Sequence, residues 1–243
     1  MRPVPTPRDA LLSGIKDASP FVIVAIPFGM LFGVVGTEAG LNLAQVMGFS
    51  IVVIAGASQF AALQLMTENA PTLIVVASAL AVNLRMAMYS ASLAPYLGAA
   101  SFWTRAFVAY MNVDQTYALS VQRYEEAPSW PVRTRAAYFF GACVPIVPVW
   151  YGATLVGALA GAAIPAEWGL DFAVPICFLA LTGPALRTGA HVAAAFVSIV
   201  VVLSLAWVPW NLGLLAAGLA GMATGAEVER RIARANAPER ARP

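Results

Sequence analysis

The chain has 243 residues, of which 60% are hydrophobic and 11% are charged, and its mean hydropathy is +0.76. Because a soluble domain carries roughly 25% charged residues, this composition excludes an ordinary water-soluble protein and indicates an integral membrane protein. The net charge of +2 comes from basic residues at the two ends and in one loop. This pattern excludes a basic nucleic-acid groove and is typical of anchoring to a lipid bilayer.

Membrane-spanning helices need about 20 apolar residues, and cutting the charge-free intervals by this length predicts about eight of them. The predicted spans are 19–36, 43–66, 72–94, 102–121, 136–160, 170–186 and two spans within 188–226, which Trp207, Pro209 and Trp210 divide. The fold class is an all-α polytopic helical bundle with helices interrupted by Gly and Pro. No metal site or cofactor is expected, because the two cysteines and the single histidine lack ligand spacing.

Basic residues near span ends give the orientation. They predict a cytoplasmic N-terminal segment (1–18), a single transmembrane domain (19–226) and a basic cytoplasmic tail (227–243). The loop 123–135 also falls on the cytoplasmic side. Arg105 is the one basic residue that this scheme places outside.

The two halves of the chain resemble each other in their Gly and Pro spacing. The positions Pro27, Gly33, Gly36 and Gly40 correspond, at an offset of about 121 residues, to Pro148, Gly152, Gly157 and Gly161. Internal repeats are frequent in secondary transporters, where broken helices line the substrate site. Chance similarity is the alternative, since Gly and Pro are common in membrane helices.

Two opposite charges stand inside apolar stretches, Arg85 in the third predicted span and Asp114 in the fourth. Such intramembrane charges are costly and mark functional sites by default. Side chains lean towards the N-terminus of their helix, so on antiparallel spans these two lean towards each other's depth. They are therefore either a structural ion pair, a site that holds a zwitterion between them, or, through Asp114, a proton-coupling site.

Further polar residues are candidates for substrate binding. Gly56, Ser58 and Gln59 interrupt the second span, where a helix opened at glycine exposes backbone groups to a cavity; a tight helix contact is the alternative. Tyr89 lies one turn after Arg85 and shares its face, whereas Asn83 stands off that face. Thr182, in the predicted sixth span, is the candidate from the second half.

Several strings resemble the AzlC family, the large subunit of two-component branched-chain amino acid exporters. They are AGASQFAA at 55–62, NLR at 83–85, SLAP at 92–95 and DQTYAL at 114–119. Two departures are Met86, where the family often has histidine, and Gln115, where it often has glutamate. The second departure leaves Asp114 as the one predicted intramembrane carboxylate available for proton transfer.

The resemblance implies a proton-coupled permease, not an enzyme. Its substrates would be leucine, isoleucine and valine, with methionine as a further candidate, and its partner a small AzlD-type membrane subunit. Two alternatives stay open: a passive channel, and an intramembrane hydrolase with Ser58 as nucleophile and His191 as base. The hydrolase lacks the glycine that should follow the serine in a nucleophile elbow.

Overall fold

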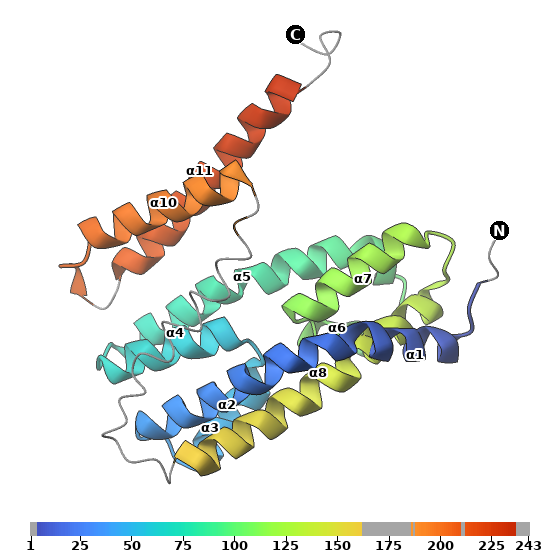
Figure 1. Cartoon of the computed structure of the whole chain (residues 1–243), viewed down its shortest axis with the longest axis horizontal. Helices are drawn as coiled ribbons and strands as arrows, with labels where there is room; N and C mark the ends of the chain where they lie inside the picture. Colours follow the sequence, from blue (N-terminus) through green and yellow to red (C-terminus); the bar gives the residue numbers. More distant parts are fainter. Residues whose placement is uncertain (1–3, 162–185, 187, 210–211, 237–243) are drawn as a thin grey trace.

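The computed structural model describes residues 4–161, 186, 188–209 and 212–236, and the regular elements in these ranges are helices (Figure 1). Three helical stretches are long and apolar enough to cross a membrane: Pro7–Glu38, Thr72–Leu97 and Val132–Gly161. The first consists of α1 (Pro7–Ala18), η1 (Ser19–Phe21) and α2 (Val22–Glu38), the second is α5 and the third is α8. The predicted N-terminal segment is thus helical from Pro7 and leads directly into the first long helix.

The first long helix and α8 run parallel and pack with their backbones in close approach. A Cβ atom built on Gly33 would lie 2.5 Å from the Ala158 backbone nitrogen, and one on Gly14 would lie 2.8 Å from that of Ala142. These separations are closer than side-chain atoms allow, so glycine is required at this contact. Small residues that permit such contact are the usual means of helix association in membranes.

The chain after α2 forms a helical hairpin from α3 (Leu43–Val53) and α4 (Gly56–Thr67). Between them, Ile54 has the left-handed φ of 38° and Ala55 is extended. Val46 and Leu63 both belong to the apolar cluster that contains Ala158. The hairpin therefore enters and leaves the bundle on the same side.

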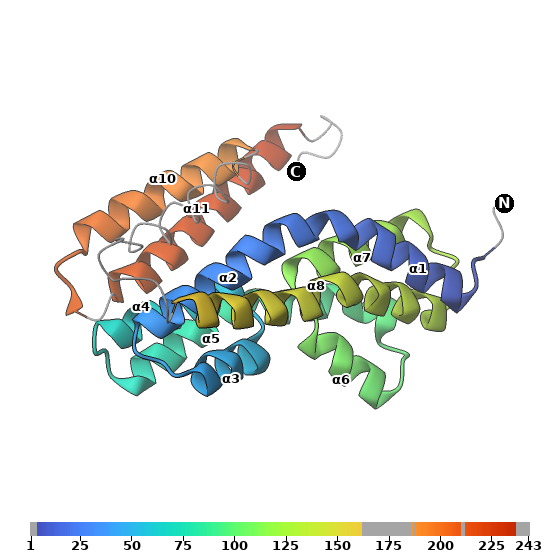
Figure 2. The same cartoon turned by 60° about the horizontal axis from the view of Figure 1, so that its bottom comes forward.

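A second hairpin follows α5 and consists of α6 (Phe102–Tyr110) and α7 (Asp114–Glu126). At its turn, the Tyr110 hydroxyl donates to the Ile51 carbonyl of α3 (2.6 Å), so the tips of the two hairpins meet. The ring of Tyr124, near the end of α7, lies 5.4 Å from that of Tyr96, near the end of α5. In Figures 1 and 2 the two hairpins occupy opposite halves of the molecule.

These hairpins change the predicted topology. The intervals 43–66 and 102–121 were expected to be single spans, but each contains two short helices that reverse direction. The connection 98–101 therefore lies on the same side as the N-terminus, which we call the N-terminal side, and 68–71 lies on the opposite side. Arg105, near the start of α6, therefore lies on the N-terminal side with the other basic residues there. It is no longer an exception to the orientation that basic residues near span ends predict.

This topology predicts which connections share a side of the membrane. Single cysteines from Glu68→Cys and Glu38→Cys should react with an impermeant maleimide from one side of the membrane. Those from Ala99→Cys and Glu125→Cys should react from the other side. Labelling before and after permeabilisation measures this, with Cys143 and Cys177 replaced. The eight-span arrangement would instead place Glu68 with Glu125, and Ala99 with Glu38.

In the second half, α10 (Gly189–Ser204) and α11 (Leu212–Asn236) form an antiparallel pair. The Ser198 hydroxyl donates to the Ala217 carbonyl across it (3.0 Å). The predicted sixth span, including Thr182, lies almost entirely outside the described residues. The internal repeat stays a prediction: its second set, Pro148, Gly152, Gly157 and Gly161, lies on α8, but the span that should follow this set lies almost entirely outside the described residues.

Candidate functional site

A small central cavity of about 60 Å³ lies between the two hairpin turns, α5 and α8. The turns of both hairpins line this cavity. Because the two hairpins enter the bundle from opposite sides, the points at which their helices are interrupted meet here. The residues that line it are Ile54, Ala55, Gly56, Arg85, Met86, Val113, Asp114, Ile146, Val147 and Trp150. Most of these side chains are apolar, whereas two carry full charges of opposite sign.

Arg85 and Asp114 form a direct ion pair in this cavity. Arg85 Nη1 lies 2.9 Å from Asp114 Oδ2, and the Tyr89 hydroxyl donates to Oδ1 of the same carboxylate (3.0 Å). The Tyr89 ring stacks on Tyr117 at a centroid distance of 4.1 Å, which fixes its orientation. Both side chains of the pair remain partly exposed, 28% for Arg85 and 44% for Asp114, so the pair is accessible from the cavity.

Asp114 stands at the N-terminus of a helix, not in the middle of a span as the sequence suggested. It is the first residue of α7, where the helix dipole favours a negative charge. Thr116 accepts the Val113 N–H (3.0 Å) and so satisfies part of the broken backbone before the helix. The carboxylate is therefore placed by a helix start and held by two side-chain donors.

The N-terminus of α4 presents unsatisfied backbone donors to the same cavity. Its N-cap, Ala55, supplies no side-chain bond, and the first helical bond runs from the Gln59 N–H to the Ala55 carbonyl. The N–H groups of the first turn therefore lack intrahelical partners, and such a helix start binds anions. A Cβ on Gly56 would lie 3.0 Å from Trp150 Cη2, so glycine leaves this approach open.

Several buried polar atoms on or beside the helices that form the cavity have no hydrogen-bond partner among the described residues. They are both amide atoms of Gln59, the Oδ1 atoms of Asn83 and Asn112, and Nε of Arg85. Buried polar groups are paired in the great majority of cases, and exceptions of this kind mark sites for ligands or ordered water. Gln59 is completely buried.

The predicted site residues separate into three groups. Gly56, Arg85 and Asp114 line the cavity, and Tyr89 contacts it through the carboxylate. Ser58 instead donates to the Ala79 carbonyl of α5 (2.9 Å), which ties α4 to α5. Gln59 and Asn83 do not line the cavity. Their buried polar atoms named above have no hydrogen-bond partner among the described residues.

Sequence reasoning missed the apolar walls of the cavity. Met86, Ile146, Val147 and Trp150 line it, but nothing in a uniformly apolar helix distinguishes a wall residue from one that faces lipid. Trp150 had a signal of its own, because its indole N–H must find an acceptor when buried. It donates to the Ser50 hydroxyl of α3 (2.8 Å).

Comparison with known proteins gives a consistent family assignment. The family model described as AzlC protein matches residues 20–164. An uncharacterized membrane protein of Archaeoglobus fulgidus is 29% identical over 213 residues, covering 86% of this chain and 90% of that protein. The inner membrane protein YgaZ of Escherichia coli K12 is 26% identical over 184 residues, covering 73% of this chain and 74% of its own length. No solved structure gives a significant match.

Proposed function

This chain belongs to the AzlC family, and we propose that it is the permease subunit of an exporter for branched-chain amino acids in the bacterial inner membrane. The observation that carries this proposal is the convergence of two hairpin turns, a helix N-terminus and two opposite charges on one cavity. Broken helices with polar ends at midmembrane depth are the usual substrate site of secondary transporters.

The cavity suits the two charged groups of an amino acid. Arg85, with its planar guanidinium, and the free N–H groups of α4 would hold the carboxylate. Asp114 would hold the ammonium group, in place of part of its present contact with Arg85. The apolar wall of Met86, Ile146 and Trp150 would contact an aliphatic side chain.

The present cavity is too small for such a substrate. Small-molecule sites have volumes of roughly 300–1,000 Å³, whereas this one has about 60 Å³. The structure therefore represents a closed form in which Arg85 and Asp114 pair with each other. Substrate entry requires the hairpins to move apart, and the substrate would then insert between the two charges.

Proton coupling is assigned to the same site. Among the described residues, Asp114 is the one carboxylate that lines the cavity, and its protonation would release both Arg85 and an ammonium group. An inward flow of protons could thus alternate with the outward movement of substrate. A small AzlD-type membrane subunit is the proposed partner.

Export from loaded cells tests the proposed function. Cells lacking other branched-chain exporters are loaded with a leucine dipeptide and express this chain alone, with its small partner, or neither. We expect leucine to appear outside several times faster with both subunits, and the rate to fall when the proton gradient is collapsed. Equal efflux in all three strains would reject the proposal. Glycine and glutamate dipeptides serve as controls for substrate class.

A further inference from the structure

A second and larger pocket opens on the N-terminal side of the protein, between α1, α7 and α8. Its volume is about 410 Å³, within the range of roughly 300–1,000 Å³ found for small-molecule sites. It is lined by Lys16, Asp17, Pro20, Leu119, Gln122, Arg123, Glu126 and Tyr138. None of these residues was a predicted site residue.

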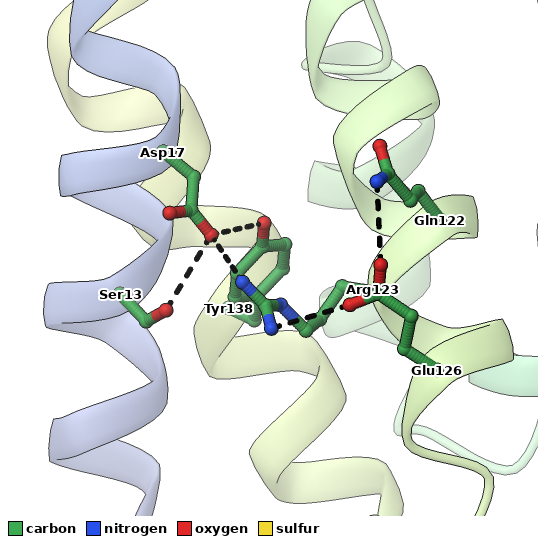
Figure 3. A network of polar contacts seen from close by, with 6 residues as sticks. All are labelled: Ser13, Asp17, Gln122, Arg123, Glu126 and Tyr138. Carbon is green, nitrogen blue, oxygen red and sulfur yellow. Dashed lines mark hydrogen bonds and ion pairs between the residues drawn. The ribbon is translucent and has the colours of Figure 1, made fainter.

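A polar network holds this pocket in shape (Figure 3). Arg123 Nη2 lies 2.7 Å from Asp17 Oδ2, and its Nη1 lies 3.4 Å from Glu126 Oε2. The Tyr138 hydroxyl also donates to Asp17 Oδ2 (2.8 Å). Three separate helices are therefore joined by one carboxylate and one guanidinium.

The network leaves charge of both signs available to a ligand. Lys16, the one lysine of the chain, is exposed and makes no ion pair among the described residues. Glu126 is half exposed, at 53%. Asp17 uses Oδ2 for all its recorded bonds, which leaves Oδ1 as an acceptor. A group that carries an anion and a cation close together complements this surface.

Only a thin apolar layer separates this pocket from the central cavity. Ala18, Ala142 and Ile146 form a buried cluster on which Val113 and Leu119 pack. Ile146 and Val113 line the central cavity, whereas Leu119 lines the second pocket. One side of this layer therefore lines the central cavity and the other side lines the second pocket. Helix α7 contributes residues to both, Asp114 to the cavity and Leu119 to the pocket.

We propose that the second pocket binds the zwitterionic part of the exported amino acid before the amino acid passes the apolar layer to the central cavity. The proposal rests on the proposed function. The carboxylate would contact Lys16 and Arg123, and the ammonium group would contact Glu126 and the free oxygen of Asp17. An aliphatic side chain would lie against Pro20 and Leu119.

Protection of a cysteine tests this site directly. Gln122→Cys, in a chain with Cys143→Ala and Cys177→Ala, is purified with the small partner and treated with a thiosulfonate reagent. Leucine should slow its modification at least about fivefold, whereas Glu125→Cys, which lies outside the pocket, should react at an unchanged rate. Lys16→Gln should raise the leucine concentration for half-protection about tenfold or more, since each 1.4 kcal/mol of lost contact is tenfold. Arg133→Gln, an exposed charge on the same side, is the matched control.

The central cavity must be removed to show that protection is local. In Arg85→Leu with Asp114→Leu, leucine should still protect the Gln122→Cys site; if that variant does not fold, Met86→Trp fills the cavity instead. Loss of protection when the central cavity is removed would overturn the proposal. So would the absence of protection in a chain that keeps Arg85 and Asp114 and exports leucine. Either result would leave the proposed function standing. Protection without export would contradict the proposed function and, with it, passage to the central cavity, while leaving amino acid binding at the second pocket; absence of both would contradict both.

Discussion

Replacing Arg85 by leucine is expected to reduce leucine export by about 100-fold or more. The variant removes the guanidinium that we propose to hold the substrate carboxylate, and among the described residues it leaves Tyr89 as the remaining side-chain donor to Asp114. A hydrogen bond to a charged group contributes about 1.5–3 kcal/mol, and about 2.7 kcal/mol corresponds to 100-fold. Initial efflux rates from dipeptide-loaded cells measure the effect.

The matched control is Arg133→Leu, which removes an equal charge from an exposed position outside both pockets. Its export rate should stay within about twofold of wild type, as for most surface substitutions. Arg85→Lys separates charge from shape, since lysine keeps the charge but cannot bind a carboxylate bidentately. We expect it to retain only part of the activity. Full export activity in Arg85→Leu would show that Arg85 does not bind the substrate.

Gly157→Leu is expected to prevent assembly of the bundle. A Cβ at this position would lie 2.6 Å from the Met30 Cα, against the backbone of the first long helix. Because the obstacle is backbone, no side-chain rotation relieves it, and α8 would have to separate from α2. Overpacking of a closely packed contact typically costs about 1–3 kcal/mol and occasionally more, and a forced separation of two long helices belongs at the upper end.

Gly152→Leu is the control on the same helix, because nothing lies within 4 Å of a Cβ built there. We expect Gly152→Leu to yield a monodisperse protein at wild-type level in detergent, and Gly157→Leu to aggregate or be absent from the membrane. Size-exclusion chromatography of a fluorescent fusion makes the comparison. Equal behaviour of the two variants would contradict the close parallel packing of α2 and α8.

The long apolar helices were predictable from the sequence because length and hydropathy determine what can cross a bilayer. Predicted spans 19–36, 72–94 and 136–160 correspond to parts of the three long helices. The interruption near Gly56 was also predictable, since glycine in an apolar helix invites a break. Its actual position, at Ile54 and Ala55, depends on contacts with α8 and α2 that a single segment does not reveal.

The second hairpin was missed because the interval 102–121 contains no Gly or Pro. Its break was signalled differently, by Asn112, Asp114 and Thr116, residue types that favour helix starts and compete for backbone bonds. Of these residues, Asp114 was interpreted as a site residue in the middle of a span, so its position at a helix start was overlooked. Arg105 was misplaced because of the first hairpin: its reversal at Ile54 and Ala55 changes the side of the connection 98–101, and the second reversal returns the loop 123–135 to the predicted side.

The contact between Arg85 and Asp114 could be predicted from side-chain chemistry alone. Two isolated opposite charges in an apolar chain must find partners, and the structure brings them within 2.9 Å. The cavity around them could not be predicted, because it is formed by turns from two hairpins and by α8. The pocket at Asp17 and Arg123 was missed because both residues were assigned to loops or tails.

Export by the double variant Arg85→Leu with Asp114→Leu is the most direct test of the central claim that the two charges hold the substrate. Removing both charges leaves neither unpaired, so a purely structural pair should tolerate the change. The proposed site predicts a folded protein, shown by size-exclusion chromatography, that exports leucine no faster than cells without the gene. Restored export in the double variant, with either single variant inactive, would show that Arg85 and Asp114 serve only each other.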